Sequence, residues 1–309
     1  MKIYFHRDFD GMAAAAILAD ALATTRGHHD VSWEGVNFDR TLEWDNFANG
    51  EEFAVVDFHY HPRAKYWFDH HPTTFLEDSH QEQYSDDENR CFDPTAKSCP
   101  PIILRHAAEH WGYTPPTHFT ELAKWSDIID SAGYESAEAA LFGTEPAMIV
   151  SRALTCAPNL QFHDTMVQLM RDQHLSDIAK HPVVEKCYKR SSKNRDNALE
   201  NFESNVLLDN GTALLADLRS KKIRRDRFAP FYLHPDVQFA VTLLPTRAGD
   251  HITVSSNPWN RPQTDFNLGE LMKKYGGGGH QSVGGCNPSD SVTAMKWARE
   301  IYNVIKDLS

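Results

Sequence analysis

The first quarter of the chain contains three short runs that are typical of buried strands, and each run ends in acidic or histidine side chains. The runs are residues 3–5, 52–56 and 65–68. They lead directly into the segments HRDFDG, DFHYHP and DHH. Because open α/β sheets bind their ligands outside the carboxyl ends of parallel strands, we expect these polar side chains to meet at one sheet edge. This pattern constrains the fold more than any other feature of the sequence.

The rest of the first half predicts helices around that sheet. Residues 11–25 (GMAAAAILADALATT) are strong helix formers, and residues 32–38 form a further candidate strand. Residues 77–93 are polar and acidic and predict a surface loop. Ser98 and Pro100 predict the cap and first turn of a helix. Helix-like apolar spacing then continues over residues 120–129, 137–141, 146–154, 164–178 and 183–206.

The last hundred residues change from helical to strand-like patterns. Strand-like runs are followed by a glycine run at Gly276 and by a last helix over residues 289–308. The sequence therefore predicts an α/β fold: a mainly parallel sheet flanked by helices, with a smaller α+β domain after it. A chain of 309 residues is long enough for two domains.

Composition and charge exclude several classes of protein. The net charge of -12 argues against a general grip on long duplex nucleic acid or on an anionic membrane. No run approaches the ~20 apolar residues that span a bilayer, and acids at Asp8 and Asp10 interrupt any signal-peptide core, so we expect a cytoplasmic protein. Five scattered cysteines fit reduced thiols, and a zinc site at Cys91 and Cys99 is the less favoured alternative.

The polar clusters contain carboxylates and imidazoles without thiolates, a donor set that suits Mn²⁺ or Mg²⁺ better than structural zinc. Converging carboxylates would repel each other unless cations neutralised them. Two ions there would activate a water for hydrolysis at phosphorus. Each cluster also has a simpler interpretation: Asp8 and Asp10 as helix N-terminal acids, Asp57 and Asp69 as turn residues, and Asp127 as a solvated acid.

The clusters HRDFDG, VVDFHYHP, FDHH and WSDIID, in this order, resemble the motifs of the DHH phosphoesterase superfamily. Near the C-terminus, GGGGHQSVGG resembles the glycine motif of the DHHA1 domain that accompanies the DHH domain. The resemblance covers nearly the whole chain. It implies a catalytic, metal-binding DHH domain over residues 1–185, a helical linker over 186–205 and a substrate-binding DHHA1 domain over 206–309.

The resemblance also implies a set of site residues. One metal ion would be held by His6, Asp8 and Asp57, and the other by Asp10, Asp57, His70 and Asp127. Asp69 and His71 would be the catalytic groups, with Asp69 orienting a neighbour and His71 donating to the substrate phosphate. The last metal ligand is the least defined, because Asp127 and Asp130 are three residues apart on one helix face and either can point inward.

The glycine motif and its surroundings indicate substrate binding. Glycines without side chains let backbone N–H groups approach a phosphate, and a histidine adds a donor; the residues concerned are Gly277, Gly278, Gly279 and His280. Where relatives carry an arginine-bearing segment, this chain has SSNPWNRPQ, in which Trp259 either stacks on a base or packs internally. The basic run over residues 219–228 either contacts phosphate or is a solvated face.

The function that this resemblance implies is a phosphoester hydrolase that uses two divalent ions, with Mn²⁺ preferred and Mg²⁺ or Co²⁺ as alternatives. The expected substrate is a small nucleotide or a short single-stranded oligonucleotide, without long duplex nucleic acid or membrane as a partner. The sequence leaves the oligomeric state open, with a homodimer as one alternative. The alternatives are a phosphoanhydride hydrolase of the exopolyphosphatase or manganese pyrophosphatase type and a nucleotide-binding regulatory protein with a relic site.

Overall fold

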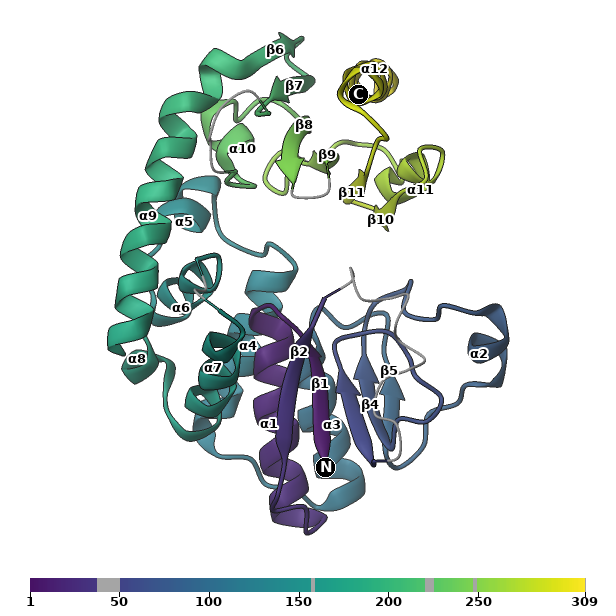
Figure 1. Cartoon of the computed structure of the whole chain (residues 1–309), viewed down its shortest axis with the longest axis vertical. Coiled ribbons are helices and arrows are strands. Elements are labelled where there is room, and N and C mark those ends of the chain that lie inside the picture. Colours follow the sequence, from purple (N-terminus) through teal and green to yellow (C-terminus); the bar gives the residue numbers. More distant parts are fainter. Residues whose placement is uncertain (38–50, 157–158, 220–224, 247–248, 309) are drawn as a thin grey trace. The chain divides into compact units, whose positions relative to one another are not determined.

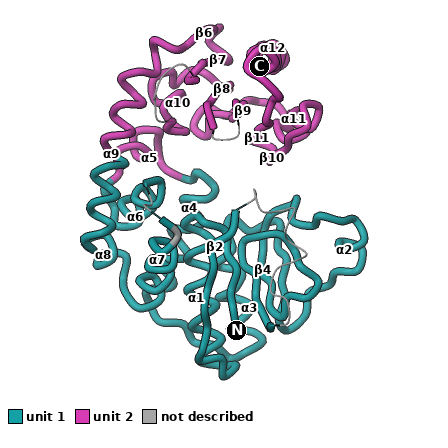
Figure 2. Tube along the Cα trace, in the orientation of Figure 1, with its two compact units in different colours: residues 1–133, 144–191 teal, residues 134–143, 192–309 magenta. Residues whose placement is uncertain are grey.

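The computed structural model describes residues 1–37, 51–156, 159–219, 225–246 and 249–308. Two compact units divide the chain, and Figure 2 shows them in different colours. Unit 1 comprises residues 1–133 and 144–191, and unit 2 comprises residues 134–143 and 192–309. Each unit has its own sheet and its own core.

Unit 1 is built on a five-stranded parallel sheet with the strand order β2-β1-β3-β4-β5 (Figure 1). Its strands are β1 (Lys2–His6), β2 (Ser32–Val36), β3 (Phe53–Val56), β4 (Tyr66–Asp69) and β5 (Arg90–Phe92). Since every strand runs in the same direction, all carboxyl ends lie at one edge of the sheet. The α/β fold with a parallel sheet that the sequence predicted is confirmed.

Helix α1 (Phe9–Thr25) is the central helix of unit 1. Residues 9–19 are all buried, since its alanines let α1 approach helices α3, α4 and α7 closely. The helices of unit 1 are α2 (Asp78–Gln83), α3 (Cys99–Trp111), α4 (Thr117–Asp130), α6 (Pro146–Leu154), α7 (Leu160–Asp172) and α8 (Leu175–Ile178). Helix α9 (Pro182–Phe202) begins in unit 1 and ends in unit 2.

An aromatic cluster forms a second core of unit 1. It contains the buried side chains of Tyr4, Phe53, Phe58, Tyr60 and Trp67, with Phe75, Tyr84 and Phe92 packed against them. Rings in this cluster meet edge to face, for example Tyr60 and Trp67 at 5.0 Å between centroids. The loop after β3 supplies part of this cluster. The apolar residues that follow Asp57 therefore anchor the segment that carries Asp57.

Unit 2 contains a six-stranded mixed sheet with the order β10-β11-β9-β8-β7-β6. Its strands are β6 (Val206–Asp209), β7 (Ala213–Asp217), β8 (Phe239–Thr246), β9 (Gly249–Ser256), β10 (Gly278–His280) and β11 (Val283–Cys286). Within this second sheet, β7 and β8 are the only described strands that pair in parallel. Helices α11 (Leu268–Lys273) and α12 (Ser291–Ile305) pack on one core, and α10 (Ala229–Leu233) belongs to another. Helix α5 (Ala137–Phe142) also belongs to unit 2, and the turn η2 (Glu203–Asn205) precedes β6.

Three details differ from the sequence-based expectations. The stretch over residues 77–93 is not simply a loop, because it forms α2 and the edge strand β5. The helix expected over residues 164–178 is two helices, α7 and α8. Strand β6, which the sequence did not predict, follows α9 after the turn η2. The basic run is only partly visible, since residues 220–224 lie outside the described residues. None of the helices described is both long and apolar enough to cross a membrane.

Candidate metal centre

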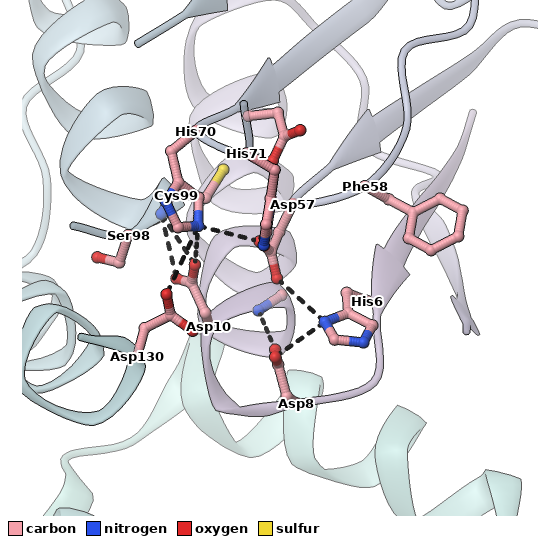
Figure 3. A network of polar contacts seen from close by, with 12 residues as sticks. His6, Asp8, Asp10, Asp57, Phe58, His70, His71, Ser98, Cys99 and Asp130 are labelled. Carbon is pink, nitrogen blue, oxygen red and sulfur yellow. Dashed lines mark hydrogen bonds and ion pairs between the residues drawn. The ribbon is translucent and has the colours of Figure 1, made fainter. Parts of the chain in front are cut away.

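The carboxyl edge of the parallel sheet collects the polar side chains that follow the strands (Figure 3). His6 is the last residue of β1, Asp57 follows β3, and Asp69 ends β4. His70 and His71 come next along the chain. Asp8 caps α1 by accepting the backbone N–H of Gly11 at 2.9 Å. Clusters that lie more than sixty residues apart in the sequence, from His6 to His71, therefore meet in one place.

Gly11 explains how the first turn of α1 comes so close to the end of β1. A Cβ atom at this position would lie 2.2 Å from the carbonyl oxygen of His6. Only glycine lets the first turn of α1 pass the end of β1 at this distance. The glycine of HRDFDG is thus required because α1 must pass close to β1 to bring Asp8 and Asp10 to the strand ends.

One group of candidate ligands consists of His6, Asp8 and Asp57. Nδ1 of His6 lies 2.8 Å from Oδ2 of Asp8 and 3.7 Å from Oδ2 of Asp57. Burial disfavours a charged His6 imidazole, but the Asp8 carboxylate outweighs it, so the pKa of His6 lies well above its ordinary value.

A second group consists of Asp10, His70 and Asp130. Nε2 of His70 lies 3.4 Å from Oδ2 of Asp10, 3.7 Å from Oδ2 of Asp130 and 3.5 Å from Oδ1 of Asp57. Burial opposes the charge on His70, yet the surrounding carboxylates raise the pKa of His70 to about 12. Burial and the charge of Asp57 raise the pKa of Asp10 well above its ordinary value.

Asp57 belongs to the first group and also contacts the second, because its Oδ1 lies 3.5 Å from Nε2 of His70. It is 1% exposed, and its φ of +54° is one of two positive values among non-glycine residues in the described chain. Its backbone N–H donates to the carbonyl of Phe68 at 2.9 Å, which holds this conformation. Within the described structure, neither carboxylate oxygen of Asp57 has a hydrogen-bond partner. A strained, buried carboxylate of this kind is typical of a functional site.

Asp69 and His71 form a third group of candidate ligands together with Asp57 and His70. Asp69 is fully buried, and its Oδ1 lies 2.8 Å from Nδ1 of His71. Burial opposes the charge on His71, but the Asp69 carboxylate outweighs it and raises the pKa of His71 to about 9. His71 can therefore present a charged donor that a carboxylate holds in one orientation.

The structure separates the two aspartates of α4 that the sequence could not distinguish. Asp130 lies in the cluster beside His70. Asp127 instead accepts the hydroxyl proton of Ser98 at 2.7 Å between oxygens. The predicted ligand Asp127 is thus placed next to the cluster, and the alternative, Asp130, is placed inside it.

Two contributors to the cluster were not found from the sequence, namely the backbone of Cys99 and the side chain of Ser98. The N–H of Cys99 donates to both oxygens of Asp10, at 3.0 and 3.2 Å. The helix start at Ser98 was the available signal, because free N–H groups at a helix N-terminus attract carboxylates. All five cysteines are free, and the Sγ of Cys99 bonds the carbonyl of Phe68.

The donor set fits divalent cations. The separations of 3.4 to 3.7 Å around His70 are too long for hydrogen bonds. They are close to the spacing of about 3 Å that two ligands adopt at right angles around an ion about 2.1 Å from each. Buried atoms without hydrogen-bond partners, Asp57 Oδ1 and Oδ2 and His70 Nε2, belong to these groups. A cation would satisfy these atoms together.

Close strand packing explains most of the glycines in the glycine run of unit 2. A Cβ atom at Gly277 would lie 2.0 Å from the carbonyl of Gly285, and one at Gly279 would lie 2.2 Å from that of Val283. These glycines let β10 and β11 pack closely. Gly278 differs, because no atom lies within 4 Å of its Cβ position. His280 is exposed at the end of β10.

The other substrate-binding candidates of unit 2 are engaged in internal contacts. Trp259 is half-buried, packs on Phe228 at 5.4 Å and donates its indole N–H to the carbonyl of Tyr134. These contacts favour packing over base stacking. The guanidinium of Arg219 is bound by Asp217 and Asp250, both at 2.8 Å.

Comparison with known proteins identifies solved structures of similar fold. A pGpG-specific phosphodiesterase, PggH from Vibrio cholerae, has a TM-score of 0.73 at 18% identity, with 100% of this chain and 99% of that chain covered. The DHH domain of a member of a ribosomal protein family has a TM-score of 0.59 at 14% identity, over 99% of this chain and 86% of that one.

A third similar structure is RecJ of Thermus thermophilus in complex with Mn²⁺. It has a TM-score of 0.57 at 15% identity, and the match covers 98% of this chain but only 52% of RecJ. No family model and no curated protein sequence matches the chain. The structural likenesses show that the chain has the fold of DHH proteins, as its sequence motifs predicted.

Proposed function

We propose that this protein is a metal-dependent hydrolase of phosphoester bonds in small nucleotides or short single-stranded oligonucleotides. The observation that carries the proposal is the buried Asp57 carboxylate. It lies between two groups of aspartate and histidine ligands, with a positive φ and without a hydrogen-bond partner in the described structure. Strained backbone and converging carboxylates of this kind occur at functional sites, where a bound cation neutralises the carboxylates.

The residues divide into ligands and a substrate-facing pair. His6, Asp8 and Asp57 would hold one ion, and Asp10, Asp57, His70 and Asp130 would hold the other; Asp130 replaces Asp127 in this set. Bound there, two divalent ions supply Lewis acidity and an activated water for in-line displacement at phosphorus. We favour Mn²⁺, with Mg²⁺ or Co²⁺ as alternatives, because the donors are oxygen and imidazole nitrogen.

Asp69 and His71 would act on the substrate itself. Asp69 holds Nδ1 of His71 at 2.8 Å, which fixes the direction in which the other ring nitrogen points. Because the pKa of His71 is raised to about 9, its imidazolium is charged at neutral pH and can donate to a phosphoryl oxygen as negative charge develops there.

Unit 2 is proposed to contribute substrate binding through Gly277, Gly278, Gly279 and His280. Gly278 is the position in this run where a ligand can approach the backbone without meeting other atoms of the chain. The exposed imidazole of His280 is two residues away and adds a donor for phosphate. The proposed domain roles are catalysis for residues 1–185, linkage for 186–205 and substrate binding for 206–309.

A dinucleotide is the first substrate to test. A similar structure that covers 100% of this chain and 99% of its own is a pGpG-specific phosphodiesterase. The net charge of -12 also favours a short substrate, since a long strand presents many phosphates that an acidic protein repels.

The deciding experiment measures hydrolysis by purified protein with Mn²⁺ and after treatment with chelator. The panel contains a linear dinucleotide, a cyclic dinucleotide, a 5-mer RNA, a 3′,5′-bisphosphate nucleotide, pyrophosphate and polyphosphate. The Asp57→Asn variant, purified in the same way, controls for a contaminating hydrolase. Metal-dependent turnover of a nucleotide substrate supports the proposal. Turnover confined to pyrophosphate or polyphosphate would replace it with phosphoanhydride hydrolysis, and metal binding without turnover would favour a regulatory role.

A further inference from the structure

Ser98 stands at the start of α3 but does not cap that helix with its side chain. It is fully buried, and its hydroxyl makes no hydrogen bond to the backbone N–H groups of α3. Instead it donates to Oδ1 of Asp127, on α4, with 2.7 Å between the oxygens. A Ser–Asp pair therefore ties the beginning of α3 to α4.

The beginning of α3 also holds one of the candidate ligands. The backbone N–H of Cys99, the residue after Ser98, donates to both carboxylate oxygens of Asp10. This N–H has no partner within α3, because the first N–H groups of a helix are not used by the helix itself. The position of Asp10 is thus coupled to the position of the α3 N-terminus.

Helix α4, which accepts this hydrogen bond through Asp127, carries a second candidate ligand. Asp127 and Asp130 are three residues apart on α4, so they lie on neighbouring turns of one helix face. Asp130 contacts His70, which also contacts Asp10. The hydrogen bond between Ser98 and Asp127 therefore joins the start of α3, whose Cys99 N–H holds Asp10, to α4, which carries Asp130.

We propose that Ser98 and Asp127 are positioning residues that set the separation of Asp10 and Asp130 and hence the affinity of the Asp10–His70–Asp130 group for a divalent ion. The inference rests on the proposed function. It assigns Asp127 the role of a hydrogen-bond acceptor for a hydroxyl, in place of a ligand. The His6–Asp8–Asp57 group contains neither α3 nor α4 and should not depend on this pair.

The test compares Mn²⁺ binding to the full chain by electron paramagnetic resonance and by calorimetry. The variants are Ser98→Ala, Asp127→Ala, Asp127→Asn and Asp130→Asn. In Ser98→Ala and Asp127→Ala we expect the Asp10–His70–Asp130 site to lose about 10- to 100-fold in affinity, the range typical when a residue that orients a ligand is removed. The site class that depends on His6, Asp8 and Asp57 should keep its affinity in both variants, which also reports correct folding.

Asp127→Asn separates a positioning residue from a ligand. The side-chain carbonyl of asparagine still accepts a hydrogen bond from Ser98, but it lacks the charge of a carboxylate. We therefore expect Asp127→Asn to bind two ions with affinities close to those of the wild type, and Asp130→Asn to lose the second ion. Raised Mn²⁺ should restore the second ion in Ser98→Ala but not in Asp130→Asn.

Three results would overturn the inference. If Asp127→Asn lost the second ion as Asp130→Asn does, Asp127 would be a ligand. If Ser98→Ala and Asp127→Ala bound both ions as the wild type does, the tie would have no role in metal binding. If the wild-type protein bound no Mn²⁺, the proposed function would fail together with this inference, whereas the first two results leave the proposed function standing.

Discussion

The polar cluster of unit 1 and the glycine run of unit 2 are both unusual in sequence, but the structure gives them different physical meanings. In the cluster, buried groups such as the Asp57 carboxylate and Nε2 of His70 have no hydrogen-bond partner within the described structure. In the glycine run, Gly277 and Gly279 fill positions where a side chain would collide with the β11 backbone. The cluster leaves buried polar atoms without hydrogen bonds, whereas most of the glycine run allows the close packing of two strands.

This difference shows how a functional residue can be recognised beside a structural one. Packing explains a glycine when the Cβ it lacks would meet backbone atoms, as at Gly277. Packing does not explain a buried carboxylate that has charged histidines around it but no hydrogen-bond partner in the described structure, as at Asp57, and this points to a bound ligand. Gly278 stands apart from its neighbours, since the space beside it is open.

The largest effect is expected at the centre of the polar cluster. Asp57→Asn should lower turnover by more than about 10³-fold, because a ligand shared by both ion sites loses its charge. Asparagine tolerates the positive φ at this position, so the fold should persist. Steady-state rates and bound Mn²⁺ are measured beside Asp78→Asn, a matched loss of charge on the exposed helix α2. Near-normal turnover in Asp57→Asn would contradict a shared ligand.

The second prediction concerns the protons that the cluster holds in metal-free protein. The pKa of His70 is raised to about 12, so metal-free His70 is charged at neutral pH and must lose a proton before it can bind a cation. Mn²⁺ affinity should therefore rise with pH by about tenfold per unit for each proton released, which for the His70 proton alone is about a hundredfold from pH 6 to pH 8. Calorimetry in buffers of different ionisation enthalpy counts the protons. An affinity that is flat with pH would exclude a charged His70.

The glycine run provides a stability test with a control inside the same motif. Gly277→Ala should lower the free energy of unfolding by about 2 to 3 kcal/mol, because its methyl group meets the carbonyl of Gly285 and the strands must move apart. Gly278→Ala, beside open space, should change it by less than about 0.5 kcal/mol. Urea-induced unfolding measures both variants. Equal losses would mean that close strand packing does not explain the motif.

The smallest effect is expected at the exposed end of the glycine run. His280→Ala should raise the KM for a nucleotide substrate by about tenfold, the effect of losing one hydrogen bond to a charged group. Mn²⁺ content and kcat should stay close to the wild type, since His280 belongs to none of the candidate ligand groups among the described residues. Loss of bound metal would show instead that His280 acts at the metal centre.

Much of the fold could be predicted because its signals are local. Apolar runs that end in polar side chains predicted β1, β3 and β4, and the alanine-rich segment predicted α1. Strand β5 was missed, because three partly buried residues carry no periodic pattern and depend on pairing with β4. The same reason applies to β6, which pairs with β7 at the sheet edge.

By itself, the sequence predicted most of the side chains that the structure brings together in the candidate site, but not Ser98 or the backbone of Cys99. The residue types and their places after successive strands are local properties, and parallel strands necessarily bring their carboxyl ends to one edge. Only the tertiary structure decided between Asp127 and Asp130. Both lie on one face of α4, so helical periodicity treats them alike, and the choice depends on how α4 packs beside α3. In that packing, Asp127 accepts the hydrogen bond of the Ser98 hydroxyl, and Asp130 lies beside His70.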